Sequence, residues 1–167
     1  MRTIAELLAI IPQTGTVRWI GLSTGRRSEI QPVEEVLALA GFGLEGDHHA
    51  KRKADTKRQV TLIQAEHLVA VAGMLHQAEI SPTLTRRNIV VSGINLLALK
   101  GQRFQIGDAI LEGTGPCEPC SRMEENLGPG GYNAMRGHGG LTAKVITAGL
   151  IRRGDSVKLL PPAQEIP

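Results

Sequence analysis

Two cysteines lie three positions apart in a proline-containing stretch of the chain. Cys117 and Cys120 are the only cysteines in the sequence, and Ser121 and Glu124 follow with the Ser-x-x-Glu spacing of a helix capping box. This spacing predicts a short helix with Ser121 as its N-cap, so that Cys120 lies just before the helix. Because helix N-termini stabilise anions and Arg122 adds a cation, the sequence favours Cys120 as a reactive thiolate or a ligand of a soft metal.

Three alternative interpretations of this Cys-x-x-Cys pair stay open. A zinc half-site needs two further ligands, which His138 and either His48 or His49 would have to supply. A thioredoxin-like redox pair belongs on a helix after a strand-helix unit, whereas a turn rich in Gly and Pro surrounds this pair. Cysteines are often buried as small hydrophobic residues, although the polar neighbours here favour exposure. We expect a functional Cys120, with Cys117 as a bystander or helper.

A glycine-rich loop follows the cysteines. Residues 128–140 contain six glycines, and such a loop lets backbone amides approach an anionic ligand closely. Arg136 and His138 are the candidate side-chain ligands of this loop. A long turn without a ligand fits the same residues.

Two further segments carry residues suited to binding. Arg86 and Arg87 precede a predicted strand, where arginines can hold a phosphate through two hydrogen bonds, although surface arginines have the same pattern. Residues 43–49 contain adjacent histidines beside acidic residues. Neighbouring histidines do not easily chelate one ion, so we expect a structural loop there rather than a metal site.

Short strands with glycine-rich turns would have to position these residues. Apolar or alternating runs predict strands at 16–20, 59–63, 88–91, 102–106, 109–112 and 156–160, and Gly-Asp pairs at 107–108 and 154–155 predict tight turns between them. Helical patterns lie at 3–11 and 65–74, and residues 32–39 also favour a helix because Pro32 precedes two glutamates. The pattern is typical of a mainly β fold, a barrel or sandwich with a few peripheral short helices.

Length and composition limit the classes of function. The chain has 167 residues, 41% of them hydrophobic and 21% charged, which predicts a single domain over residues 1–167. A net charge of +3 suits a small anionic ligand but is weak support for binding of nucleic acid. Aromatic residues make up only 2% of the chain, so it lacks a platform on which nucleic-acid bases could stack. No apolar run approaches the ~20 residues of a membrane helix, and the N-terminus lacks a signal pattern, so we expect a cytoplasmic protein with no membrane partner.

In their order along the chain, these segments resemble the MOSC (molybdenum-cofactor sulfurase C-terminal) domain family, in its small stand-alone bacterial form. The resemblance covers roughly residues 15–160 and implies a MOSC-type β-barrel. It also implies that the functional cysteine is Cys120, which follows Pro119 as the family pattern requires, and not Cys117. The matching segments are 43–48, 58–63, 85–91, 106–109, 117–124, the glycine-rich loop and 154–157.

The same resemblance implies a set of ligands for the molybdenum cofactor, molybdopterin. In family members that bind this cofactor, the cysteine ligates molybdenum, and an arginine at the start of an Arg-x-Asn-aliphatic strand contacts the pterin. Cys120 is therefore the expected metal ligand, and Arg86 and Asn88 are expected cofactor ligands, with Gln64 as a weaker match. The other candidates for holding the cofactor are Arg87, Arg122, Arg136 and His138.

Three functions follow from the resemblance. The first is an enzyme that binds molybdopterin and reduces N-hydroxylated substrates with electrons from a partner protein, since no flavin or nicotinamide motif is visible. The second is a sulfur carrier, in which Cys120 accepts a persulfide from a cysteine desulfurase. The third is a non-catalytic cofactor-binding module. A thiolate suits both molybdenum and a persulfide, so the sequence leaves the choice open.

Overall fold

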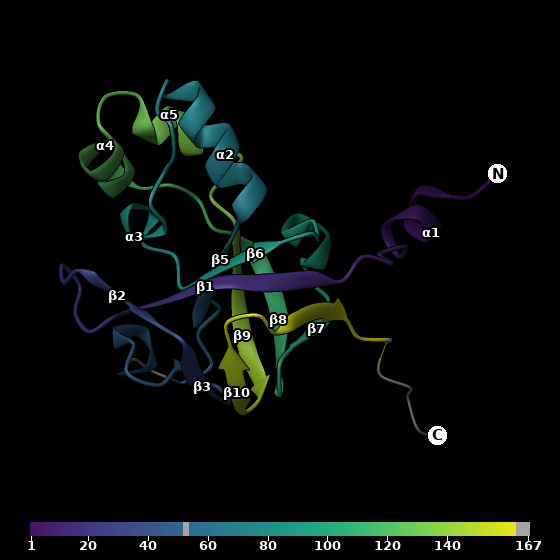
Figure 1. Cartoon of the computed structure of the whole chain (residues 1–167). Helices are drawn as coiled ribbons and strands as arrows, with labels where there is room; N and C mark the ends of the chain where they lie inside the picture. Colours follow the sequence, from purple (N-terminus) through teal and green to yellow (C-terminus); the bar gives the residue numbers. More distant parts are fainter. Residues whose placement is uncertain (52–53, 163–167) are drawn as a thin grey trace.

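Seven strands close into a barrel in the computed structural model of this chain, which describes residues 1–51 and 54–162 (Figure 1). Strands β5 and β6 are parallel and the other neighbours in the barrel are antiparallel, and the last strand, β11, pairs back with β1. The predicted mainly β barrel is confirmed. In order around the barrel the strands are β1 (Gly15–Ser23), β6 (Ile89–Ser92), β5 (Val60–Gln64), β9 (Leu141–Thr147), β8 (Ala109–Pro116), β7 (Arg103–Ile106) and β11 (Ser156–Leu159).

Four more strands lie outside the barrel. One of them extends the barrel sheet beyond β1, and the other three form a small separate sheet. The extending strand is β2 (Ile30–Val33), and the small sheet has the order β10 (Gly149–Arg152), β3 (Glu35–Leu39) and β4 (Gly43–Leu44).

The helix predicted for residues 32–39 is wrong, because this segment forms β2 and β3. Val36 and Ala38 are buried whereas Glu35 and Leu37 are exposed, which is the two-residue period of a strand. Pro32 is compatible with β2 because this strand lies at the edge of its sheet, where a missing N–H removes no bond to a second neighbour. The two glutamates that favoured a helix lie around the turn between the strands.

The two Gly-Asp turns differ in whether the strands that they connect pair with each other. Gly107 and Asp108 join β7 and β8, which pair as the predicted hairpin. Gly154 and Asp155 follow β10 and precede β11, but β10 pairs with β3, and β11 pairs with β7 and β1. The second turn is present as predicted, but it carries the chain from the small sheet into the barrel and does not close a hairpin.

Short helices complete the fold. The helix predicted for residues 65–74 is confirmed, and the N-terminal helix is shorter than predicted. Figure 1 shows that most of the helices gather on one side of the barrel, while the N-terminal helix stands apart from it. The helices are α1 (Ile4–Leu8), α2 (Ala65–Met74), α3 (Pro82–Thr85), α4 (Ser121–Leu127) and α5 (Gly131–Met135), with 3-10 turns η1 (His48–Lys51) and η2 (Leu96–Leu99).

The capping box predicted for α4 is wrong. Cys120 itself is the N-cap of this helix, in extended backbone geometry and without a side-chain cap. The carboxylate of Glu124 instead accepts hydrogen bonds from the backbone amides of Gly130 and Tyr132, each at 2.9 Å. Glu124 therefore joins α4 to the start of α5. Cys120 lies just before the helix, as predicted, but it is the N-cap in place of Ser121.

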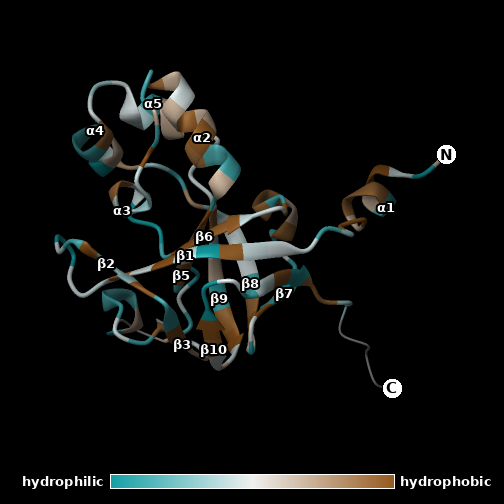
Figure 2. Cartoon of the chain, in the orientation of Figure 1, coloured by the Kyte–Doolittle hydropathy of each residue, from teal (hydrophilic) through white to brown (hydrophobic). Residues whose placement is uncertain are grey.

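Two hydrophobic cores stabilise the molecule. One fills the barrel with aliphatic side chains and Phe104, and the other lies between the helices and the outer faces of β5 and β6, around Met123 and Met135. Figure 2 shows the hydrophobic colour along the barrel strands and also on α1, none of whose residues is buried. Within the described ranges, no helix is long and apolar enough to cross a membrane.

Candidate functional site

The exposed side chain of Cys120 lines a polar cavity of about 580 Å³. Three segments distant in sequence form the other walls: the loop after β1, the turn at residues 47–49 and the residues just before β6. The barrel brings these segments together because β1 pairs with β6 and the end of β8 leads into α4. The cysteine chosen from the sequence therefore faces a built cavity, whereas Cys117 is buried.

The cavity is strongly positive. Among residues 1–51 and 54–162, six arginines line it and Asp47 is the single carboxylate. Because arginines outnumber carboxylates, the walls favour an anionic ligand, through charge-assisted hydrogen bonds and through the summed field of the guanidinium groups. The arginines are Arg26, Arg27, Arg58, Arg86, Arg87 and Arg122.

Arg86 connects the strand start before β6 to the loop after β1. Its backbone has the left-handed conformation, with φ of 58°. Its guanidinium donates to the carbonyl oxygen of Ser28 at 2.9 Å, to Oγ of Ser23 at 3.2 Å and to the carbonyl oxygen of Arg26 at 3.3 Å. Burial and the neighbouring charge of Arg122 lower the pKa of Arg86. Arg86 thus holds one wall of the cavity in place.

Arg87 is buried and donates to backbone carbonyl oxygens on several segments. Its Nε bonds Gly139 at 2.8 Å and its Nη1 bonds Thr85 at 2.9 Å, while Nη2 bonds Cys117 at 3.2 Å and Glu118 at 3.4 Å. Burial lowers the pKa of Arg87. Its donors are therefore largely used by the protein, and this side chain fixes the segment that leads to Cys120.

Asn88 is a buried connector beneath the cavity. Its amide nitrogen donates to the carbonyl oxygen of Gly21 at 3.1 Å and to Oδ2 of Asp47 at 3.0 Å. Its amide oxygen accepts from the backbone N and the hydroxyl of Thr61, each at 3.1 Å. Asn88 therefore joins β1, β5 and the turn at residues 47–49 beside the site.

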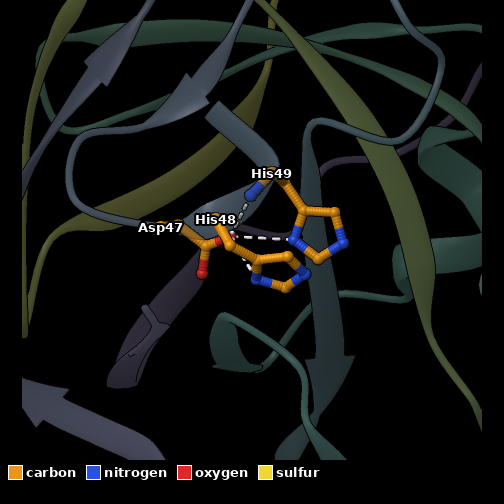
Figure 3. Close-up of side chains that lie close together, drawn as sticks. All are labelled: Asp47, His48 and His49. Carbon is orange, nitrogen blue, oxygen red and sulfur yellow. Dashed lines mark hydrogen bonds and ion pairs between the residues drawn. The ribbon is translucent and has the colours of Figure 1, made fainter. Parts of the chain in front are cut away.

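Asp47 and two histidines form a compact group on the cavity wall (Figure 3). Oδ1 of Asp47 accepts from the backbone N of His49 at 2.9 Å and lies 2.8 Å from its Nδ1. Burial raises the pKa of Asp47, but the hydrogen bonds from the His49 side chain and from the backbone of Ser23 and His49 outweigh it and lower the pKa. An ionised carboxylate only accepts, so Nδ1 of His49 is the donor.

The same three side chains have potential ligand atoms within 4.8 Å of one another, as a metal site would require. Both oxygens of Asp47 already accept hydrogen bonds, Oδ1 from His49 and Oδ2 from the backbone N of Ser23 at 2.9 Å and from Asn88. Nδ1 of His48 lies 3.1 Å from the carbonyl oxygen of Ser23, which can only accept. The hydrogen bonds of Asp47 and His48 are therefore those of a structural loop.

Three of the residues predicted as ligands lie away from the Cys120 cavity. Oε1 of Gln64 accepts from the backbone N of Leu96 at 2.9 Å, and Gln64 lines a separate cavity. Nδ1 of His138 lies 3.1 Å from the carbonyl oxygen of Ala134, and Arg136 is an exposed residue at the end of α5. Arg122, in contrast, lies on the cavity with Cys120.

Three arginines of the cavity are not among the ligands predicted from the sequence. Arg26 and Arg27 lie in the loop after β1, and Arg58 precedes β5. Their side chains are exposed, and within residues 1–51 and 54–162 they have no hydrogen bond or ion pair. Arg26 and Arg27 match no motif, so only their positive charge could have indicated a role. Arg58 begins the segment 58–63 that resembles the MOSC family, but the resemblance implied no role for its side chain.

This chain belongs to the MOSC domain family, whose model matches residues 45–158. Solved structures share the fold: the YuaD protein from Bacillus subtilis has a TM-score of 0.75 and 19% identity, covering 89% of this chain and 97% of its own. YiiM from Geobacillus stearothermophilus has a TM-score of 0.72 and 16% identity, covering 90% and 77%. YiiM from Escherichia coli has a TM-score of 0.67 and 18% identity, covering 90% and 72%. No curated protein matches the chain.

Proposed function

We propose that this protein binds a molybdopterin-type cofactor, with Cys120 as the ligand of the molybdenum, and reduces N-hydroxylated substrates. The observation that carries the proposal is one cavity that joins the exposed sulfur of Cys120 to six arginines. A thiolate is the soft ligand that a polarisable metal takes, and guanidinium groups hold phosphate. The donors present therefore fit both ends of the cofactor.

Five of the six arginines divide into two groups by their hydrogen bonds, whereas Arg122 forms an ion pair with Glu125. Arg86 and Arg87 donate to the protein itself and position the walls. Arg26, Arg27 and Arg58 carry their donors on exposed side chains at the cavity. These three arginines are the stronger candidates for the phosphate, because their hydrogen bonds to it would replace only bonds to water.

When bound, the molybdenum would supply the two-electron removal of oxygen, with electrons from a partner protein. The net reaction takes R–NH–OH, two electrons and two protons to R–NH₂ and water. His49 can hold and release a proton at Nε2, because Nδ1 donates to Asp47 and fixes the ring. Cys120 and the arginines would bind the cofactor and orient it relative to the proton on His49.

Metal content in a host that makes molybdopterin tests this proposal. Molybdenum and released pterin are measured on purified wild type, on Cys120→Ala and on the matched control Cys117→Ala. We expect near-stoichiometric metal in wild type and Cys117→Ala, and loss in Cys120→Ala. Equal metal in wild type and Cys120→Ala would falsify the ligand assignment. Reduction of benzamidoxime by the loaded protein with a chemical electron donor tests the substrate class.

A sulfur carrier is the second candidate, and the exposure of Cys120 favours it. Its thiol is free and accessible, as a persulfide acceptor must be, whereas Cys117 is buried. Incubation with a cysteine desulfurase and cysteine, followed by mass spectrometry, tests this function. A mass increase of one sulfur on Cys120, in protein purified without molybdenum, supports the carrier. An unmodified Cys120 contradicts it.

A further inference from the structure

The Cys120 cavity combines an accessible nucleophile with positive charge. The thiol of Cys120 is free and its side chain is exposed. The exposed side chains of Arg26, Arg27 and Arg58 lie on the same cavity. Reactive cysteines occur in such electropositive, accessible surroundings. Ligation of a metal would occupy this sulfur only when the cofactor is bound, so the chain without cofactor presents it to solvent.

The charge of the cavity walls selects among the molecules that the sulfur could attack. Within residues 1–51 and 54–162, Asp47 is the single carboxylate on the cavity, and both of its oxygens already accept hydrogen bonds from the protein. A positively charged cleft raises the association rate of anions by about 10–10³. Exposed guanidinium groups also bind carboxylates through paired hydrogen bonds. The cavity therefore favours an electrophile that carries carboxylates near the atom under attack.

We propose that Cys120 of the cofactor-free chain forms a mixed disulfide with a small disulfide whose two halves carry carboxylates, as peptide disulfides do. The thiolate of Cys120 attacks one sulfur of this molecule, which forms a new S–S bond and breaks the original one. The other half leaves as a thiolate and takes a proton from solvent, so the sulfur of Cys120 is oxidised and the departing sulfur is reduced. Arg26, Arg27 and Arg58 then hold the carboxylates of the attached half.

Cys117 is not placed to displace the attached half. Its side chain is 1% exposed and lines a different cavity from Cys120. Its backbone is fixed on both sides, because its N donates to the carbonyl oxygen of Gly140 at 2.8 Å and its carbonyl oxygen accepts from Arg87 at 3.2 Å. Release of the attached half needs a second thiolate that reaches the mixed disulfide. The adduct on Cys120 should therefore persist until an added thiol reduces it.

Such an adduct is a reversible cap on the sulfur. It would block the position proposed above for molybdenum, and a reducing thiol would open that position again. This regulatory consequence rests on the proposed function. The exchange itself does not, because it needs only the sulfur of Cys120 and the charge of the cavity.

Three disulfides of different charge test the proposal on the full chain purified without molybdenum. Glutathione disulfide is anionic, hydroxyethyl disulfide is neutral and cystamine is cationic, and mass spectrometry follows the adduct on Cys120. Each rate is divided by the rate of the same disulfide with N-acetylcysteine amide, a neutral thiol, to remove differences between the leaving groups. The protonation of Cys120 affects all three rates equally.

After this correction, we expect glutathione disulfide to react about tenfold or more faster than the neutral disulfide at low salt, and cystamine to react slowest. In about 1 M salt the three corrected rates should converge, because the charges on the cavity are then screened. The adduct should be absent from Cys120→Ser and present in Cys117→Ser.

Arginine variants separate the effect of the cavity from that of net charge. Arg26→Gln, Arg27→Gln and Arg58→Gln should each slow the reaction of glutathione disulfide by about twofold or more, and more than that of the neutral disulfide. Arg2→Gln is the matched control. It removes the same charge from an exposed residue outside the cavity, beside the helix that stands apart from the barrel in Figure 1, and should change no rate.

Several results would overturn the proposal. They are the absence of an adduct with any of the disulfides, equal corrected rates for the three at low salt, and a loss of rate in Arg2→Gln as large as in the cavity variants. A Cys117–Cys120 disulfide in place of the adduct would also overturn it. Molybdenum content is measured separately, so a wild-type protein that binds no metal would contradict the proposed function and not this exchange.

Discussion

Arg87 donates a hydrogen bond to the carbonyl oxygen of Cys117, 3.2 Å away, and so connects a buried cation to the segment that ends in Cys120. The same guanidinium bonds the carbonyl oxygens of Gly139 and Thr85. Carbonyl dipoles, and not a carboxylate, thus compensate the buried charge in these bonds. The position of Cys120, the candidate metal ligand, therefore depends on Arg87, whose hydrogen-bond donors already bond to the protein.

Replacement of Arg87 by lysine is expected to lower the free energy of unfolding by about 2–4 kcal/mol. A lysine has no fork of donors and cannot bond all of these carbonyl oxygens, and hydrogen bonds to charged groups contribute about 1.5–3 kcal/mol each. Urea unfolding at neutral pH measures the change. Arg58→Lys is the control, since Arg58 is exposed, and it should change the stability by less than about 0.5 kcal/mol. A similar small change in both variants would contradict the role of Arg87.

Thiol labelling under native conditions is expected to modify one of the two cysteines. Cys120 is exposed and Cys117 is 1% exposed, so a soluble thiol reagent should reach only Cys120 until the protein unfolds. Titration with a chromogenic disulfide, before and after addition of denaturant, counts the reactive thiols. Cys120→Ser should show none in the native state, and Cys117→Ser should show one. Two reactive thiols in native wild type would contradict the burial of Cys117.

Local sequence predicted a mainly β fold, a barrel or sandwich, because its strands alternate and its turns carry Gly-Asp pairs, and the resemblance to the MOSC family implied the barrel. The prediction failed at Pro32. Proline has no N–H to donate, so it fits the first turn of a helix and also an edge strand, and at both positions the N–H has no partner. It failed again at Ser121, because Glu124 bonds the backbone of Gly130 and Tyr132, and that contact depends on tertiary structure.

The candidate site could be predicted only in part. Cys120, Arg86 and Arg122 do share a cavity, which the resemblance to the MOSC family and the local pattern indicated. Arg26 and Arg27 could not be predicted, because pairing of distant strands places their loop beside Cys120. Long-range pairing leaves no periodicity in the sequence around such residues.

Asp47→Asn is expected to change how stability depends on pH. The folded pKa of Asp47 lies below the ordinary value of about 3.9, so its carboxylate stabilises the fold fully above that value and loses the effect as pH falls through the folded pKa. At pH 7 the variant should be less stable by about 1–3 kcal/mol, and the difference should shrink in acid. Unfolding by urea at several pH values between neutral and acid measures it. A difference between wild type and Asp47→Asn that stays constant across this pH range would contradict the assignment.

Gly140→Ala is expected to destabilise the protein far more than Gly154→Ala, although both glycines have positive φ, 94° and 92°. A Cβ on Gly154 would meet no atom within 4 Å, so that variant should lose only the strain of a left-handed residue, about 1–2 kcal/mol. A Cβ on Gly140 would collide with the backbone carbonyl of Leu62 in β5, which cannot move without breaking the barrel pairing.

Gly140 also accepts the hydrogen bond from the backbone N of Cys117 at 2.8 Å, so the collision would displace the segment of the candidate site. We expect Gly140→Ala to lose about 3 kcal/mol or more beyond Gly154→Ala, measured by urea unfolding. If the variant is insoluble, thermal unfolding of Gly140→Ala in the presence of a stabilising osmolyte gives the comparison. Equal losses in the two variants would show that the close approach of Gly140 to β5 is not needed for the fold.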